Sequence, residues 1–461
     1  MPGSIELRKM RVLVIGLART GVATALFCAK RNAIVTATET RAESELGDAA
    51  QKLREAGITL ELGGHVEKTY LAQDLIIPSP GVPADDALLS KARSKGITIW
   101  SEMELAYRFL EGELIGITGS NGKTTTTTLV HHILKESGKK TILAGNVGTP
   151  LIACVEEMKP DTVSVVELSS FQLELTDKFR PNIGVFLNLT PDHLDRHKTL
   201  AAYSAAKARI FAKQTELDAA VLNADDEPTV ALAPKKPQVF WFSRKKAVPQ
   251  GACVHGEDIV ILHHGKEELL MKAAEIPLPG AHNLENVLAA AMAARLADVN
   301  AALIGKAVKS FKAVEHRLEF VAEIGGVRYY NDSKATNVDA TLKALDAFPG
   351  RILIVLGGKD KGSDYTVLQK PLREKAILAL LIGAAADKIE NQITGSVAIE
   401  RAVTLEHAVE LASQVAKAGD VVLLAPACAS FDQFQSYEHR GRVFKELVRE
   451  LPGHGPEKVT R

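Results

Sequence analysis

The sequence predicts an α/β protein of three domains, each built on a mainly parallel sheet. Three observations support this prediction. Short apolar segments rich in β-branched residues alternate with helical segments along the chain. The 461 residues are too many for one hydrophobic core. Polar residues repeatedly follow the predicted strands, and open α/β sheets bind ligands beyond the carboxyl ends of their strands.

The first predicted domain covers residues 1–101 and is Rossmann-like. It opens with a buried strand and a glycine turn, "RVLVIGLARTG", which matches G-x-A-x-x-G at Gly16, Ala18 and Gly21. Glu39 ends the next strand, at the distance expected of a ribose-binding acid. Taken alone, this pattern suggests a dehydrogenase, but Ala18 replaces the glycine that lets a pyrophosphate approach closely. The turn can equally hold another nucleoside diphosphate, such as UDP, or serve only strand–helix packing.

The second predicted domain, residues 102–313, is P-loop ATPase-like with a parallel sheet. Its first strand leads into "GITGSNGKTTTTTLV", in which Gly119 and Gly122 allow backbone N–H groups to surround phosphates at a helix N-terminus. Lys123 is expected to reach the outer phosphates and Thr124 to ligate Mg²⁺. Ile117 stands where the usual G-x-x-x-x-G-K-[ST] pattern has glycine, so this is a shortened variant.

Further polar residues follow the next strands of this domain. Glu167 ends the strand "TVSVVE", where an acid is well placed for Mg²⁺ or is simply solvated. His193 and His197 are four apart, so zinc must be considered, but Pro191 indicates a loop. Lys207 lies on the helix "YSAAKARIF", and its spacing alone favours a solvated charge.

The rest of the chain completes the second domain and forms the third. "GACVHGEDIVILHHGKEELLMKAAEIPLPG" predicts a small antiparallel flap, and "HNLENVLAAAMAARLA" predicts a long helix. The third domain, residues 314–461, repeats the α/β alternation in "VRYYNDSKATN", "RILIVLGGKDKG", "AILALLIGAAADKI" and "DVVLLAPACASFDQF". It is therefore predicted to be Rossmann-like as well.

The composition argues against several classes of protein. Lys+Arg and Asp+Glu both number 56, and this zero net charge argues against a nucleic-acid or membrane-surface role. The four cysteines are far apart and form no C-x-x-C pair, which argues against a disulfide framework or a zinc site. The apolar stretch "VLVIG" near the start is too short for a signal peptide or a membrane span. These features predict a cytoplasmic protein, with a monomer as the default.

The motifs, taken together and in order, resemble those of the Mur ligases. They are "GSNGKTT", "GNVG", "ELSSFQLE", "PDHLDRH", "YSAAK", "HNLEN", "HR", "NDSKATN" and "PACASFDQF", and they span the chain from Gly16 to about Tyr437. The last two motifs are similar to those of members that add D-glutamate. The resemblance implies an ATP-dependent ligase that joins D-glutamate to UDP-N-acetylmuramoyl-L-alanine through an acyl phosphate. Such a ligase would serve peptidoglycan synthesis, and with it cell wall biogenesis, cell shape and cell division.

The resemblance also implies roles for individual residues. ATP would be bound by Gly119, Ser120, Asn121, Gly122, Lys123, Thr124, Thr125, Asn283, Asn286, Arg317 and Asp332. The UDP substrate would be bound by Arg19, Thr20, Thr40, Arg41, Ser79, Gly81, Asn146, Ser169, Gln172 and His193. D-Glutamate would be bound by Lys334, Thr336, Lys361, Ser430 and Tyr437, where Lys361 is favoured over Lys359 and Tyr437 replaces a usual phenylalanine.

Catalysis and metal binding are implied for an overlapping set. Lys123, Glu167, His193 and Lys207 would be catalytic. Thr124 and Glu167 would hold one Mg²⁺ ion, and His193 and Lys207 a second, with Lys207 carbamylated. A hinge is expected at residues 313–315, because a closing third domain would keep water from the acyl phosphate.

Three rival functions are weighed against this one. A folate-type ligase shares the phosphate loop but lacks a separate UDP-binding domain, so "GLARTG" and "NDSKATN" argue against it. A regulatory ATPase needs no acceptor site and would hydrolyse ATP without one. A dehydrogenase would bind a nicotinamide cofactor at the first glycine turn.

Overall fold

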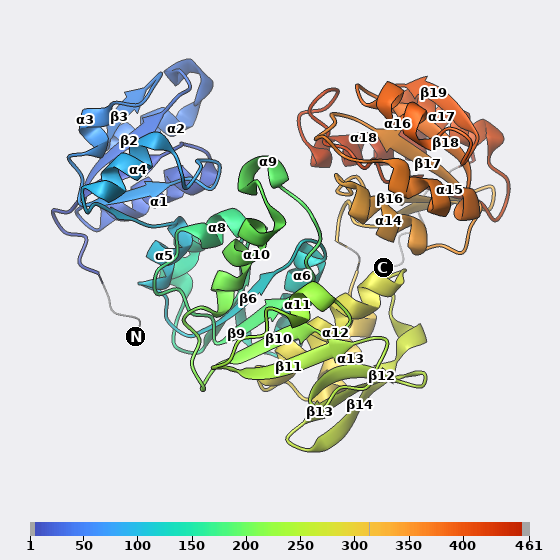
Figure 1. Cartoon of the computed structure of the whole chain (residues 1–461), viewed down its shortest axis with the longest axis horizontal. Helices are drawn as coiled ribbons and strands as arrows, with labels where there is room; N and C mark the ends of the chain where they lie inside the picture. The colour runs from blue at the N-terminus through green and yellow to red at the C-terminus, as the bar shows by residue number, and fades with distance from the viewer. Residues whose placement is uncertain (1–4, 313, 454–461) are drawn as a thin grey trace. The chain divides into compact units, whose positions relative to one another are not determined.

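The computed structural model describes residues 5–312 and 314–453, which pack into two compact units (Figure 1). Of these, residues 5–273 and 287–308 form the first unit, and residues 274–286, 309–312 and 314–453 form the second. Three mostly parallel sheets confirm the predicted fold class. The predicted boundaries at residues 101 and 313 stay predictions. The expected hinge includes Ala313, which lies outside the described residues.

The first sheet is fully parallel and has the strand order β3-β2-β1-β4-β5. Its strands are β1 (Arg11–Ile15), β2 (Ile34–Glu39), β3 (Thr59–Leu62), β4 (Leu75–Pro78) and β5 (Thr98–Ile99), with helices α1 (Arg19–Lys30), α2 (Asp48–Glu55), α3 (Glu67–Tyr70) and α4 (Ala87–Ser94). The glycine turn joins β1 to α1. A Cβ at Gly21 would lie 1.8 Å from the Gly16 carbonyl oxygen, so the turn requires glycine there.

The second sheet has nine strands in the order β14-β13-β12-β11-β10-β9-β6-β8-β7. They are β6 (Glu113–Thr118), β7 (Lys140–Gly145), β8 (Thr162–Glu167), β9 (Ile183–Phe186), β10 (Ala219–Asn223), β11 (Gln238–Ser243), β12 (Gly251–His255), β13 (Asp258–His263) and β14 (Lys266–Lys272). The strands from β12 to β14 pair antiparallel, as expected of the flap. However, β12 also pairs parallel with β11, so the flap continues the central sheet.

The helices of this part of the chain are mostly short. They are α5 (Glu102–Tyr107), α6 (Lys123–Glu136), α7 (Leu151–Cys154), α8 (Ser170–Glu174), α9 (Leu194–His197), α10 (Leu200–Ala208), α11 (Glu227–Val230), α12 (Ala281–Leu296) and α13 (Ala301–Ser310). Residues 287–294 of α12 are completely buried, which explains the run of alanines there. The loop predicted from Pro191 is followed at once by the one-turn helix α9, which contains His197.

The third sheet has the order β15-β16-β20-β17-β18-β19 and is parallel except for the β15–β16 pair. Its strands are β15 (Glu319–Ile324), β16 (Val327–Asn331), β17 (Ile352–Gly357), β18 (Ala376–Ile382), β19 (Ile399–Val403) and β20 (Val421–Leu424), with helices α14 (Val338–Asp346), α15 (Gln369–Lys375), α16 (Ala386–Ile393), α17 (Leu405–Val415) and α18 (Tyr437–Glu450). The last strand, β20, lies between β16 and β17. Both faces of this sheet carry a hydrophobic core.

No helix among the described residues is both long enough and apolar enough to cross a membrane.

A buried carboxylate on α5 anchors the segment between α8 and β9. Glu104 is completely buried, and its Oε2 accepts hydrogen bonds from the backbone N–H groups of residues 177–179 at 2.8–3.0 Å. Its Oε1 accepts a 2.5 Å hydrogen bond from Nε of Arg108, whose guanidinium lies 4.3 Å from the Trp100 ring centroid. One carboxylate therefore satisfies four donors, three of which are backbone N–H groups.

We expect Glu104→Ala to destabilise the first unit by about 3–5 kcal/mol, because a buried cation and buried N–H groups lose their partner. Urea denaturation followed by tryptophan fluorescence measures this, since Trp100 lies next to Arg108. Asp161→Asn is the control, because its ion pair with Lys140 is exposed and should change stability by less than about 1 kcal/mol. Equal effects of the two substitutions would contradict the anchoring role.

Candidate active site

The central site forms where three neighbouring strands end. In the order β9-β6-β8, the phosphate loop follows β6, Glu167 ends β8, and Asn188 follows β9. After β6 the chain forms β7 and β8 on one side of that strand and then crosses to form β9 and β10 on the other side. This reversal is the topological switch point at which α/β sheets bind ligands.

The phosphate loop has the conformation that its glycines predict. Gly119 has φ 150°, and a Cβ there would lie 2.9 Å from the Leu187 side chain. Gly122 has φ 84° and is the N-cap of α6. Asn188 fixes the loop by accepting from Asn121 N at its Oδ1, over 2.8 Å. Gly119, Gly122 and Asn188 thus give the loop a shape that can surround a phosphate.

Two lysines converge on one backbone oxygen of this loop. Lys123 Nζ donates to the carbonyl oxygens of Gly119 at 2.8 Å and Ser120 at 2.7 Å. Lys207 Nζ donates to the same Gly119 oxygen at 2.7 Å. The interpretation of Lys207 as a solvated charge is wrong, because the residue is only 1% exposed. Burial, reinforced by the charge of Lys123, lowers the pKa of Lys207 well below its ordinary value, which favours a neutral amine.

Oxygen donors lie beside these lysines. Glu167 is 1% exposed, which excludes a solvated strand-end acid. Its Oε1 accepts a 2.8 Å hydrogen bond from Asn146 Nδ2, and its backbone oxygen accepts from Asn146 N at 3.0 Å. Thr124 is buried in the first turn of α6. A carboxylate and a hydroxyl are ligands that Mg²⁺ accepts, so the donor set fits such an ion.

His193 lies at the edge of the same region. It has φ 53°, and its side chain is 42% exposed. Its ring packs edge-on against Phe171, with centroids 5.0 Å apart, and 6.4 Å from the ring of Tyr203. Lys207 Nζ lies 4.7 Å from the Tyr203 ring centroid. Tyr203 is therefore a common neighbour of the two residues expected at a second metal.

The second histidine has a structural role. His197 is buried, with Nε2 2.9 Å from Ser170 Oγ and Nδ1 3.3 Å from Glu174 Oε1. Among the described residues, the only group of three His, Cys, Asp or Glu side chains close enough together to share a metal ion is Glu315, His316 and Glu319. The zinc alternative for His193 and His197 therefore finds no support.

Several predicted substrate residues contact one another or neighbouring loops. Ser169 and Gln172 form a capping box at the start of α8, with Ser169 N donating to Gln172 Oε1 at 2.9 Å. Arg19 Nη2 donates to the Gly148 carbonyl of the "GNVG" loop at 2.8 Å. Arg196, which the sequence analysis did not single out, donates to the carbonyl of Gly81 at 3.1 Å. Only its place in "PDHLDRH" hinted at a role.

In the first sheet, Glu39 braces the glycine turn. Its Oε2 accepts from Leu17 N and from Arg41 Nη2, both at 2.8 Å, and its Oε1 accepts from Thr40 N at 2.9 Å. Both carboxylate oxygens are thus engaged by the protein, which argues against the ribose-binding role that a dehydrogenase requires. Ser79 Oγ donates to the Gly16 carbonyl at 2.9 Å, so the turns after β1, β2 and β4 meet. Thr20 lies in the first turn of α1.

In the second unit, three polar motifs follow adjacent strands. The motif "NDSKATN" follows β16, "PACASFDQF" follows β20, and "GGKDKG" follows β17. Asp332 is buried, which raises its pKa to about 7, and its Oδ1 accepts from Leu318 N at 3.3 Å. Lys334 Nζ donates to Tyr437 Oη at 2.9 Å. The backbones of Lys359 and Ala429 pair, joining two of the motifs.

The remaining predicted residues of the second unit differ in exposure. Lys359 and Lys361 are both exposed, so the structure does not separate them, whereas Ser430 is buried and Thr336 is half-buried. Asn283 and Asn286 are buried, and Asn286 Nδ2 donates to Asn283 Oδ1 at 3.1 Å. Within the second unit the structure thus joins Lys334 to Tyr437 and Asn283 to Asn286.

Three parts of the chain match known domain families. A MurD-like N-terminal domain of Mur ligases matches residues 10–101, the Mur ligase middle domain matches residues 117–294, and the Mur ligase glutamate ligase domain matches residues 316–428.

Curated relatives are similar over nearly their whole length. The UDP-N-acetylmuramoylalanine–D-glutamate ligase of Koribacter versatilis is 54% identical over 448 residues, which cover 97% of this chain and 99% of the relative. The ligase of the same name from Acidobacterium capsulatum is 53% identical over 447 residues, with 96% and 97% covered.

Solved structures share the fold. The MurF ligase of Thermotoga maritima, in complex with ADP, has a TM-score of 0.61 at 17% identity, with 90% of this chain and 95% of that chain covered. The UDP-N-acetylmuramate-alanine ligase of the same organism has a TM-score of 0.58 at 21% identity, with 95% and 99% covered.

We expect the Glu39 brace to make stability depend on pH. The hydrogen bond from Arg41 is the largest cause that lowers the pKa of Glu39, from 4.5 to about 2. Because the folded-state pKa is depressed, the stabilisation is fully present above about pH 4.5 and is lost as the pH falls toward 2.

Glu39→Gln should therefore destabilise the first unit by about 2 kcal/mol at pH 7, with the difference from wild type shrinking below pH 4.5. Urea denaturation at a series of pH values checks this. A difference that stays constant from pH 7 to pH 3 would show that the carboxylate is not the cause.

Proposed function

The chain belongs to the Mur ligase family, and we infer that it joins D-glutamate to UDP-N-acetylmuramoyl-L-alanine with ATP as the energy source. The observation that carries this conclusion is 53–54% identity, over nearly the full chain, to ligases named for that reaction. The product is a peptidoglycan precursor, so the protein serves cell wall biogenesis, and through it cell shape and cell division.

The reaction explains why a phosphate loop is needed. A carboxylate anion is a poor acceptor for an amine, but phosphorylation gives an acyl phosphate from which phosphate can leave. The carboxylate must first approach the triphosphate. Two like charges about 4 Å apart repel by roughly 4 kcal/mol at an effective dielectric of about 20, which corresponds to nearly a thousandfold in rate. Cationic groups must offset that repulsion.

We assign the ATP phosphates to the loop from Gly119 to Thr125. The left-handed glycines and the N-terminus of α6 support this assignment, as does the position of Lys123 Nζ within the loop. Thr124 and Glu167 would hold one Mg²⁺ ion, because they supply hydroxyl and carboxylate oxygens. When bound, Mg²⁺ neutralises charge on the phosphates.

Lys207 is the residue for which a modification is proposed. An ammonium group cannot ligate a cation, but a neutral buried amine can add to CO₂. A bond forms from Nζ to the carbon of CO₂, a proton leaves, and the resulting carbamate presents two oxygens. With His193, these oxygens fit a second Mg²⁺ ion. The burial of Lys207 and its lowered pKa support the proposal, and Lys123 would neutralise the new negative charge.

The remaining roles are proposed on position. The turns after β1, β2 and β4, with Arg19, Thr20, Thr40, Arg41, Ser79 and Gly81, would hold the UDP group. Asn146, Ser169, Gln172 and His193 would line the rest of that substrate. Asn283, Asn286, Arg317 and Asp332 would contact ATP, and Lys334, Thr336, Lys361, Ser430 and Tyr437 would contact D-glutamate. Support comes from the turns that follow β1, β2 and β4, from the position of Asp332 directly after β16, and from the pairing of Lys334 with Tyr437.

The setting of the reaction follows from its substrates. ATP and a UDP-sugar are found in the cytoplasm, which is the proposed location. We propose a monomer that needs no nucleic acid and no membrane partner, because each substrate is a small molecule for which the chain carries a candidate site.

The test of the function supplies ATP, Mg²⁺, UDP-N-acetylmuramoyl-L-alanine and either enantiomer of glutamate. We expect one phosphate released for each D-glutamate joined, no reaction with L-glutamate, and transfer of ¹⁸O from the labelled substrate carboxylate into phosphate. Lys123→Ala should abolish turnover in a folded protein, because it removes a cation at the phosphates. Phosphate without ¹⁸O would rule out the acyl phosphate.

The carbamate has its own test. Protein equilibrated with ¹³C-bicarbonate should show a carbamate signal in its ¹³C NMR spectrum, since Lys207 supplies a neutral amine. Lys207→Arg is the matched control, because it keeps a long cationic chain that cannot form the carbamate, and its spectrum should lack the signal. Identical spectra for the two proteins would refute the modification at Lys207.

A further inference from the structure

Three residues of α18 face one short segment of the second unit. Tyr437, Gly441 and Lys445 are four residues apart, which places them on one side of the helix. Opposite them lie residues 315–319, which include Arg317. The segment and the helix are more than a hundred residues apart in sequence, so this contact is purely tertiary.

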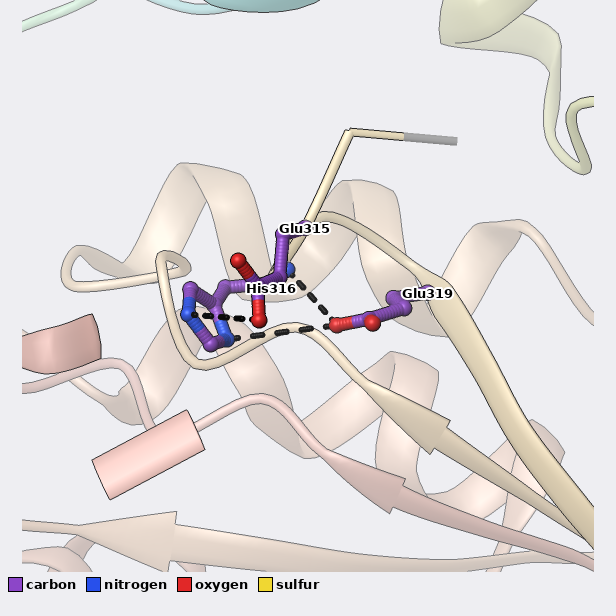
Figure 2. A group of neighbouring side chains, drawn as sticks. All are labelled: Glu315, His316 and Glu319. Atoms are coloured by element: carbon purple, nitrogen blue, oxygen red, sulfur yellow. Dashed lines mark hydrogen bonds and ion pairs between the residues drawn. The ribbon is translucent and has the colours of Figure 1, made fainter. Parts of the chain in front are cut away.

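Lys445 clamps both ends of the segment. Its Nζ donates to Glu315 Oε1 at 2.5 Å and to Glu319 Oε1 at 3.0 Å, and its side chain is only 12% exposed. Figure 2 shows the carboxylates of Glu315 and Glu319 close to the His316 ring. The donor atoms of these three residues are close enough together to surround a cation, but Lys445 already supplies the positive charge. We therefore read the cluster as an ion-paired clamp.

The imidazole of His316 is packed against the helix. His316 is 2% exposed, and a Cβ at Gly441 would lie 2.2 Å from its Nδ1, so the ring fits only because residue 441 is glycine. Its backbone N donates to Glu319 Oε2 at 2.9 Å, as Figure 2 shows, and its Nδ1 accepts from Asn331 Nδ2 at 2.9 Å. The edge of the Tyr437 ring contacts it, with centroids 6.2 Å apart.

These contacts hold Arg317 in an unusual backbone. The residues on either side, His316 with φ 65° and Leu318 with φ 41°, are both left-handed, although neither is glycine. Side chains other than glycine rarely adopt this conformation, and it persists only where the surroundings enforce it. Leu318 N is held by the Asp332 carboxylate and His316 N by Glu319. The direction in which Arg317 extends is thus set by its neighbours' contacts.

We propose that Lys445 is a positioning residue for Arg317. By pairing with Glu315 and Glu319, it fixes the strained segment to the helix that also carries Tyr437. The proposed ATP-binding arginine and the proposed glutamate-binding tyrosine then move as one rigid piece. This inference rests on the proposed contact between Arg317 and the ATP triphosphate.

Calorimetry in the presence of Mg²⁺ tests the proposal without turnover, with a non-hydrolysable ATP analogue and ADP as ligands. Lys445→Met keeps the length of the side chain and removes its charge. We expect it to weaken binding of the analogue about tenfold and of ADP less than about twofold, because the misplaced arginine acts on the outermost phosphate. Lys445→Arg should restore binding of the analogue.

Arg449→Met is the matched control, because it removes a positive charge from an exposed position in the last turn of the same helix and should leave both affinities unchanged. Gly441→Ala tests the same segment in a second way, because it displaces His316 without changing any charge. It should weaken binding of the ATP analogue more than binding of ADP. Circular dichroism establishes that each variant is folded.

The proposal is overturned if Lys445→Met binds both ligands as wild type does, if it weakens both equally, or if Lys445→Arg fails to rescue. If the variants bind the ligands as expected but the wild-type protein joins no D-glutamate, the proposed function is refuted and the positioning role remains supported. Wild-type ligation combined with an unaffected Lys445→Met would do the reverse.

Discussion

Parallel pairing of neighbouring strands is the constraint on which this protein's chemistry depends. Parallel strands end at the same edge of a sheet, so segments distant in sequence meet there. The phosphate loop, Glu167 and Asn188 follow β6, β8 and β9, and the motifs of the second unit follow β16, β20 and β17. The loops themselves can vary in chemistry because the sheet alone determines where they begin.

In the central site, two lysine side chains lie close together. Lys123 and Lys207 donate to the same Gly119 oxygen, an arrangement that favours loss of a proton from the more buried amine. Glu167 lies close by as a buried carboxylate held by Asn146. The nucleotide and metal ion proposed for this site would bring charges that offset those of the lysines and the carboxylate.

Local patterns in the sequence predicted the fold class and many candidate site residues. The features that they did not predict depend on long-range packing. The glycines of the phosphate loop were recognisable because their backbone conformation is a local property. The spacing of Lys207 wrongly indicated a solvated charge. Its burial comes from contacts with Tyr203 and the phosphate loop, which are distant in sequence or set by the tertiary fold. Glu39 stood at the right distance for ribose, yet spacing along the chain could not reveal that Leu17, Thr40 and Arg41 occupy its oxygens. The clamp around Lys445 joins residues 126 to 130 positions apart, beyond any local signal.

The place of β20 in the third sheet has a consequence for biosynthesis. This strand, residues 421–424, is made after β16 and β17, yet it separates them and pairs with both. Until it leaves the ribosome, two inner strands have open hydrogen-bonding edges of the kind that invites aggregation. A nascent chain that stalls before this point therefore lacks the central strand of this sheet and exposes strand edges that promote aggregation.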